Sequence, residues 1–153
     1  MGFFKSINNF AKSAMGDTKA MIEQGHWMMK NGQIDAGINC FSGAAIKGDQ
    51  EAMVLWGNAL IEHGNADVDT LGGLVQIYKA VIVQPSYSNH LDDAMAHRKT
   101  LSLLSMNDAM LDNLKAAVLS NPYRSADDLD RRAADMVIDV IKGSPTVVPS
   151  FLR

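Results

Sequence analysis

Residues 16–32 read GDTKAMIEQGHWMMKNG, and residues 48–64 read GDQEAMVLWGNALIEHG. The two stretches share the pattern G-D-x-x-A-M-x-x-x-G-x-x-x-x-x-x-G at a constant offset of 32 positions. The aspartate after the first glycine can accept a hydrogen bond from a free N–H group of a first helical turn, and the last glycine suits a left-handed C-terminal cap. The pattern therefore predicts two helices, over residues 17–31 and 49–63.

Apolar residues recur at helical spacing along most of the chain, and the sequence has no long strand-like alternation. Asp69 is a candidate N-terminal cap for one of these helices, and Pro85 ends that helix. Beyond the repeated pair, helices are predicted over residues 3–14, 33–47, 68–83, 91–105, 107–119 and 125–142. The predicted fold class is therefore all-α.

The bulk composition excludes several classes of protein. A chain of 153 residues with 47% apolar and 20% charged residues suits one globular domain. A formal net charge of −3 gives no electrostatic footprint for nucleic acid. No apolar run approaches the roughly 18 residues of a membrane span, and the first residues lack the apolar segment of a signal peptide. We therefore expect a protein that neither binds nucleic acid nor spans a membrane and that is cytoplasmic, or else exported by a route that leaves no removable signal.

Gly25 and Gly57 occupy the same place in the two repeated stretches, inside the predicted helices. A glycine in a helix interior costs about 1 kcal/mol relative to alanine. Its presence at one register in both copies predicts that a neighbouring backbone lies against each glycine. Helix pairs that recur with a period of about 20–50 residues are typical of helical solenoids, in which each hairpin buries its apolar side on the next.

The run over residues 35–64, DAGINCFSGAAIKGDQEAMVLWGNALIEHG, resembles the Sel-one-like repeat, a relative of the tetratricopeptide repeat. Trp56 stands where that family has leucine, and a further copy downstream is degraded. The resemblance covers roughly residues 16–100 and implies a protein-binding scaffold without chemistry of its own. The positions that match the family pattern are Ala36, Phe41, Ala44, Ala45, Gly48, Asp49, Ala52, Gly57 and Gly64.

These observations predict a short α-solenoid of helical hairpins in a single domain, with extra helices at both ends. Residues 1–15 are expected to form an N-terminal capping helix. Residues 16–100 are expected to hold the repeats, and residues 101–153 the C-terminal helices and a tail.

The expected function is non-catalytic binding of another protein through a repeat surface. The resemblance implies that the first helix of each hairpin lines the inner face of the stack, and the partner is expected to bind there. Trp27 stands where the second copy has Ala59, and it either fills the core or serves as an exposed anchor. The residues expected to contact the partner are Trp27, Asn39, Ser42, Ile46, Lys47, Gln76 and Lys79. An alternative is a small bacterial or phage inhibitor or immunity protein that blocks one target enzyme.

Residues with chemical potential are few. His90, Asp93 and His97 share one helical face, which leaves open an enzyme or metal protein, although ordinary surface residues account for them better. Cys40 is the single cysteine and occupies an apolar helix position, so a buried, inert thiol is expected. No catalytic or cofactor motif is found, and we expect no enzyme activity, cofactor or metal. A solvated charged face is expected from Arg131, Arg132, Asp127, Asp128, Asp130 and Asp135.

Overall fold

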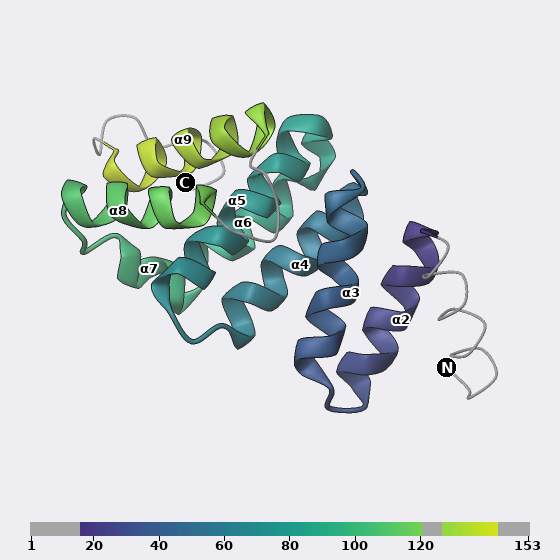
Figure 1. Ribbon diagram of the computed structural model, residues 1–153. Helices are drawn as coiled ribbons and strands as arrows, with labels where there is room; N and C mark the ends of the chain where they lie inside the picture. Colours follow the sequence, from purple (N-terminus) through teal and green to yellow (C-terminus); the bar gives the residue numbers. More distant parts are fainter. Residues whose placement is uncertain (1–15, 121–126, 144–153) are drawn as a thin grey trace. The chain divides into compact units, whose positions relative to one another are not determined.

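The computed structural model describes residues 16–120 and 127–143, and every regular element in these two ranges is helical (Figure 1). The all-α prediction is therefore confirmed for the described residues. The capping helix predicted over residues 3–14 lies outside them. The helices are α2 (Thr18–Lys30), α3 (Ile34–Ile46), α4 (Gln50–His63), α5 (Asp67–Val83), η1 (Pro85–Tyr87, a 3-10 turn), α6 (Ser88–Ala96), α7 (Arg98–Leu103), α8 (Asp108–Leu119) and α9 (Asp128–Lys142).

The repeated Gly-Asp dipeptide starts a helix in the same way in both copies. The Asp17 carboxylate accepts a hydrogen bond of 3.1 Å from the backbone N–H of Ala20 at the start of α2. The Asp49 carboxylate accepts one of 2.9 Å from the N–H of Ala52 at the start of α4. Both bonds satisfy a donor that a first helical turn leaves free. The two predicted N-terminal caps are confirmed.

The glycines of the repeated pattern do not all serve one purpose. Gly16 and Gly48, which precede the capping aspartates, adopt φ angles of 87° and 100°. Gly32 closes α2 with a φ of 79°, as predicted for a left-handed cap. Gly64 lacks this conformation, so the left-handed cap predicted there is wrong. A side chain on Gly64 would collide with a carbonyl of α4 and with Asp69, so close packing selects the glycine instead.

The predicted helix over residues 91–105 is divided in the structure. Helix α6 ends at Ala96, and His97 then adopts an extended backbone conformation. The Nδ1 atom of His97 accepts a hydrogen bond of 3.2 Å from the N–H of Lys99 and so caps the start of α7. A side-chain acceptor at this position competes with helix continuation, which explains the break.

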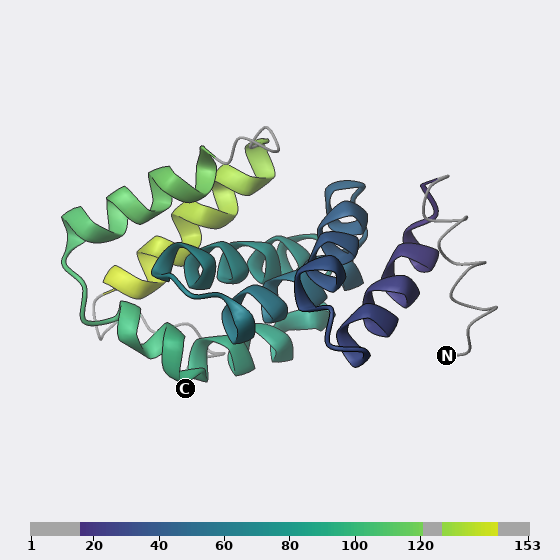
Figure 2. The ribbon, with the colours of Figure 1, turned by 60° about the horizontal axis from the view of Figure 1, so that its bottom comes forward.

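The chain divides into two compact units, Met1–Trp56 and Gly57–Arg153, whereas the sequence predicts one domain. The boundary falls inside α4. In the first unit, α2 and α3 pack together as a hairpin, with Phe41 and Ala44 buried on α3. In the second unit, α5 packs against α6, α7, α8 and α9 (Figure 2). Leu71, Leu74 and Ile77 of α5 are fully enclosed in this second core.

Glycines set the closest approach inside the α2–α3 hairpin. A Cβ atom added to Gly25 would lie 2.6 Å from the Phe41 ring and 3.2 Å from Cβ of Cys40. A Cβ atom added to Gly37 would lie 3.0 Å from the Gly25 carbonyl oxygen and 2.6 Å from Met29. The two helices therefore cross where each contributes a glycine.

The contact between α4 and α5 uses the same arrangement in the second unit. A Cβ atom on Gly57 would lie 2.5 Å from the Gly73 carbonyl oxygen and 2.6 Å from Ile77. A Cβ atom on Gly73 would lie 2.5 Å from the Gly57 carbonyl oxygen and 2.8 Å from Ile61. In both hairpins each glycine therefore meets the partner glycine or the side chain four residues after it. The close backbone predicted at Gly57 is present.

Candidate functional site

The outward side of α3 carries three of the residues expected to bind a partner. Asn39, Ser42 and Ile46 follow one another at helical spacing, so they lie along one face of the helix. Asn39 is exposed, Ser42 is half-buried, and Ile46 is 56% exposed. The Ser42 hydroxyl donates a hydrogen bond of 3.0 Å to the Asn39 carbonyl of its own helix. The face therefore offers a polar strip that ends in an uncovered apolar side chain.

Two further predicted residues, Lys47 and Trp27, belong to the same unit. Lys47 follows the last residue of α3 and is exposed. Trp27 lies on α2 and is half-buried, which matches neither a fully packed core residue nor a free anchor. Four of the seven predicted residues therefore lie together, on α3 and at its C-terminal cap.

Gln76 and Lys79 are not on an open surface. Their exposed fractions are 1% and 5%, so the accessible position predicted for them is wrong. Helix α5 is covered by several helices of its unit, and its interior has no face left for solvent. The Nζ atom of Lys79 instead forms an ion pair of 2.8 Å with the carboxylate of Asp130 on α9. A charge removed from water needs such a partner.

Asp130 also departs from the solvated face predicted for its neighbours, since it is only 2% exposed. Its carboxylate accepts a hydrogen bond of 3.2 Å from the N–H of Asp127, while the Asp127 carboxylate accepts one of 2.8 Å from the N–H of Asp130. This reciprocal pair is a capping box at the start of α9. The spacing of the two aspartates is a sequence signal for the box, although nothing in it reveals the lysine on α5.

A mostly apolar recess of about 300 Å³ opens beside α8 in the second unit. Uncovered apolar side chains continue from it, since Leu104 is 49% exposed and Met110 is 47% exposed. Methionine-rich surfaces adapt their shape to apolar ligands. The lining residues are Asp67, Met106, Met110, Asn113 and Leu114. None of them was predicted from sequence, because the periodic pattern of α8 does not identify a face that neighbours leave open.

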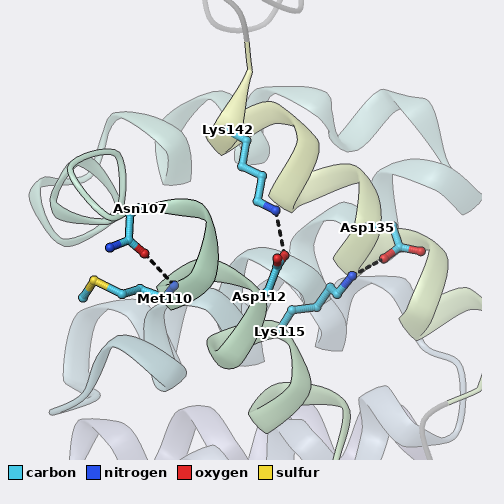
Figure 3. Close-up of polar contacts among 6 residues, drawn as sticks. All are labelled: Asn107, Met110, Asp112, Lys115, Asp135 and Lys142. Atoms are coloured by element: carbon cyan, nitrogen blue, oxygen red, sulfur yellow. Dashed lines mark hydrogen bonds and ion pairs between the residues drawn. The ribbon is translucent and has the colours of Figure 1, made fainter.

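Helices α8 and α9 are tied together by two ion pairs (Figure 3). The Nζ atom of Lys142 lies 2.7 Å from the Asp112 carboxylate, and that of Lys115 lies 2.9 Å from the Asp135 carboxylate. The hydrogen bond from Lys142 lowers the pKa of Asp112, and the same bond raises the pKa of Lys142. The Lys142 pair lies at the end of α9 and the first half of α8, and the Lys115 pair joins the second half of α8 to the middle of α9.

A second, more polar recess of about 450 Å³ contains two of the three candidate metal ligands. His97 is engaged as the cap of α7, and His90 lies against the Tyr87 ring with centroids 5.7 Å apart. In residues 16–120 and 127–143, no three His, Cys, Asp or Glu side chains are grouped so as to hold a metal ion. The recess is lined by Asn58, Ile61, Glu62, Asp93, Ala94 and His97.

Cys40 lies half-buried on α3, next to the Gly25 contact. Burial raises the pKa of its thiol. Because the thiolate is the nucleophilic form, this environment opposes reactivity.

Comparison with protein-family models, with curated proteins and with solved structures finds no match to this chain. Across the described parts of the chain, no helix combines the length and the apolar character needed to cross a membrane. The candidate surfaces therefore rest on geometry alone: the strip on α3 and the recess beside α8.

Proposed function

We propose that this chain is a non-catalytic protein-binding module of the Sel-one-like type, a short α-solenoid that contacts its partner through α3. The observation that carries the proposal is the strip formed by Asn39, Ser42 and Ile46. Its apolar end, Ile46, is 56% exposed. Full burial of an exposed isoleucine is favourable by about 1.5–3 kcal/mol, and a docked partner would gain the share that belongs to the exposed part of Ile46.

The internal likeness of the two glycine contacts supports a repeat architecture. Helical repeats present binding side chains from rigid stacked hairpins, and rigid presentation reduces the entropy lost on binding. The glycine contacts hold the inner side of α3 against α2, so the outer strip has a fixed orientation. The resemblance of residues 35–64 to the Sel-one-like repeat points to the same role.

The test is site-specific photocrosslinking in the cells from which the protein comes. A benzophenone side chain placed at Asn39 should yield one discrete crosslinked protein. The same group at Arg132, an exposed residue of α9, serves as the matched control and should not yield that product. Identical products from both positions, or none from Asn39, would count against the proposal.

A second pair of variants tests whether Ile46 contacts the partner directly or only lies near it. Ile46→Asp should abolish the crosslink from Asn39, because a carboxylate cannot be desolvated in an apolar contact without a large loss. Ile46→Leu keeps the apolar volume and should retain the product. If the captured partner is one enzyme whose activity falls on binding, the module acts as an inhibitor.

A further inference from the structure

The turn between α2 and α3 holds an asparagine followed by a glycine, Asn31 and Gly32, and both residues are exposed (Figure 1). It is the one Asn-Gly pair in the sequence. Asparagine is a thermolabile residue, because the backbone nitrogen of the next residue can attack its side-chain amide carbon. Glycine obstructs this attack least, because it has no Cβ atom beside the nitrogen. The turn therefore carries the chemical groups of a self-modification site.

Two hydrogen bonds hold the reacting groups in the folded chain. The Asn31 side-chain N–H donates a bond of 2.7 Å to the Trp27 carbonyl. The Gly32 backbone N–H donates one of 3.1 Å to the Met29 carbonyl. The first bond engages the group that has to leave, and the second engages the nitrogen that has to attack. Both acceptors belong to the last turn of α2, so opening of that turn alone releases them.

The surroundings of Gly32 do not oppose such an opening. A Cβ atom added to Gly32 would have no other atom within 4 Å, so no neighbouring segment lies against the residue on that side. Exposed helix ends open at a low free-energy cost. The φ angle of Gly32 is 79°, which a glycine adopts without strain. The reacting pair is therefore held by local hydrogen bonds of the α2 terminus.

We propose that Asn31 is a site of spontaneous deamidation, in which the Gly32 nitrogen attacks the Asn31 side chain when the last turn of α2 opens. The nitrogen gives its proton to solvent and bonds to Cγ of Asn31. The Cγ–Nδ2 bond breaks, and the amide nitrogen takes up a proton and leaves as ammonia. Water then opens the cyclic imide at one of its two carbonyl groups, which yields aspartate or isoaspartate without an oxidant or a reductant. This inference is independent of the role proposed for α3.

Both products weaken the end of α2. A carboxylate has no N–H to donate to the Trp27 carbonyl, and it places a negative charge at the negative end of the helix dipole. Isoaspartate also adds one carbon atom to the backbone that joins α2 to α3. The modification therefore loosens the hairpin that these two helices form.

The first test incubates the full chain at mildly alkaline pH in water enriched in the heavy oxygen isotope, followed by peptide mapping with mass spectrometry. The peptide that contains Asn31 should gain the heavy oxygen and appear in both an aspartate and an isoaspartate form. Asn39 and Asn65 are internal controls, because both are exposed and neither precedes a glycine. Equal labelling at the three asparagines, or none at Asn31, would overturn the proposal.

Gly32→Ala separates the attack from the opening of the helix. The variant strains the turn, since alanine disfavours a φ angle of 79°, and the strain makes opening easier. The added methyl group nevertheless crowds the attacking nitrogen, so labelling at Asn31 should slow at least about tenfold. Unchanged or faster labelling would show that this nitrogen is not the attacking group.

Unfolding tests whether the opening of α2 limits the reaction. Guanidinium chloride removes both hydrogen bonds, so labelling at Asn31 should be several-fold faster than in the native chain. Equal rates in the native and the unfolded chain would refute the opening as the limiting step.

The effect on the hairpin is measured with a variant that reproduces one product. Asn31→Asp should lower the urea midpoint of unfolding, because it removes the bond to the Trp27 carbonyl and adds the unfavourable charge. Asn39→Asp is the matched control, since it adds the same charge at an exposed position inside α3, and it should leave the midpoint nearly unchanged. A parent-like midpoint for Asn31→Asp would contradict the loosening of the hairpin.

Discussion

The α2–α3 hairpin and the α4–α5 contact share one packing arrangement. In each, two helices cross at a pair of glycines, Gly25 with Gly37 and Gly57 with Gly73. Each glycine also meets a side chain four residues after its partner, which places Phe41 and Ile77 at equivalent positions. Gly25 and Gly57, which hold the same place in the two repeated stretches, therefore both lie at a close helix crossing.

The two crossings differ in what surrounds the second helix. Helix α3 keeps an outward strip with Ile46 exposed, whereas α5 is covered by α6, α7, α8 and α9. The coverage leaves Lys79 buried and paired with Asp130, while Lys47 beside α3 is exposed. The same glycine-mediated helix crossing therefore occurs beside an exposed helix face in the first unit and inside a buried core in the second.

The largest expected effect comes from breaking the buried pair. Lys79→Met leaves the Asp130 carboxylate buried without its cation, and the free energy of unfolding should fall by about 3–5 kcal/mol. Urea denaturation followed by circular dichroism measures this loss. Lys47→Met in the open hairpin is the matched control and should change stability by about 0.5 kcal/mol or less. Similar losses for both variants would refute the contrast between a closed and an open hairpin.

The next largest loss of stability is expected from variants that disturb the helix crossings at the paired glycines. Gly73→Ala places a Cβ atom 2.5 Å from the Gly57 carbonyl oxygen, which is backbone, and should cost about 3 kcal/mol. Gly25→Ala meets the Phe41 ring, a side chain with more freedom to move, and should cost about 1–2 kcal/mol.

Gly72→Ala is the internal control for both, since its nearest non-local atoms are 4.0 Å from the added Cβ. It should stabilise α5 by about 0.5–1 kcal/mol through helix propensity. The same denaturation experiment applies. A loss of stability in Gly72→Ala, or none in Gly73→Ala, would remove the crossing as the reason for the glycines.

The sequence predicts local structure well where one residue decides it. Asp17 and Asp49 mark helix starts because a short carboxylate satisfies a free N–H group, whatever the rest of the chain does. The break at His97 was missed, because a histidine cap is a weaker signal than an aspartate cap. The prediction for Gly64 failed because packing against Asp69, rather than backbone conformation, selects that glycine.

The candidate site is less predictable than the fold, because exposure depends on distant segments. Lys79 is on α5 and Asp130 is on α9, and no local pattern connects them. A usable signal is the low charge of residues 70–83, in which Lys79 is the only charged residue, since a helix that is apolar all round is a buried one. The recess beside α8 arises from residues on α5, on α8 and between α7 and α8, so only the assembled unit reveals it.

A smaller effect tests whether the repeated Gly-Asp dipeptide contributes equally to the free energy of unfolding in both copies. Asp17→Ala and Asp49→Ala each remove one N-terminal cap, and each should lower the free energy of unfolding by about 1 kcal/mol. Asp17→Asn and Asp49→Asn retain an acceptor oxygen and should be nearly neutral. The measurement is the urea midpoint of the four variants. Unequal losses for the two alanine variants would show that the local geometry is shared but its energetic role is not.

The smallest effect is the pH dependence of the exposed pair between Asp112 and Lys142. The hydrogen bond lowers the pKa of Asp112, so its contribution to stability is complete above the ordinary aspartate value of about 3.9 and is lost as the pH falls through the lowered native pKa. The pKa of Lys142 is raised, so its contribution is complete below about 10.4 and is lost as the pH rises through the raised native pKa.

Between about pH 5 and pH 9 this pair should therefore add no slope to the stability curve. Melting temperatures of the parent chain and of Asp112→Asn, measured from pH 2 to pH 11, isolate the contribution. The two curves should differ by a small constant at neutral pH and converge in strong acid, where Asp112 is protonated. At the alkaline end they should only begin to approach each other, because the raised pKa of Lys142 keeps much of its charge in the folded state. A difference that persists unchanged into strong acid would mean that Asp112 acts through packing on α8, and that the closed unit does not depend on this pair to hold α9 in place.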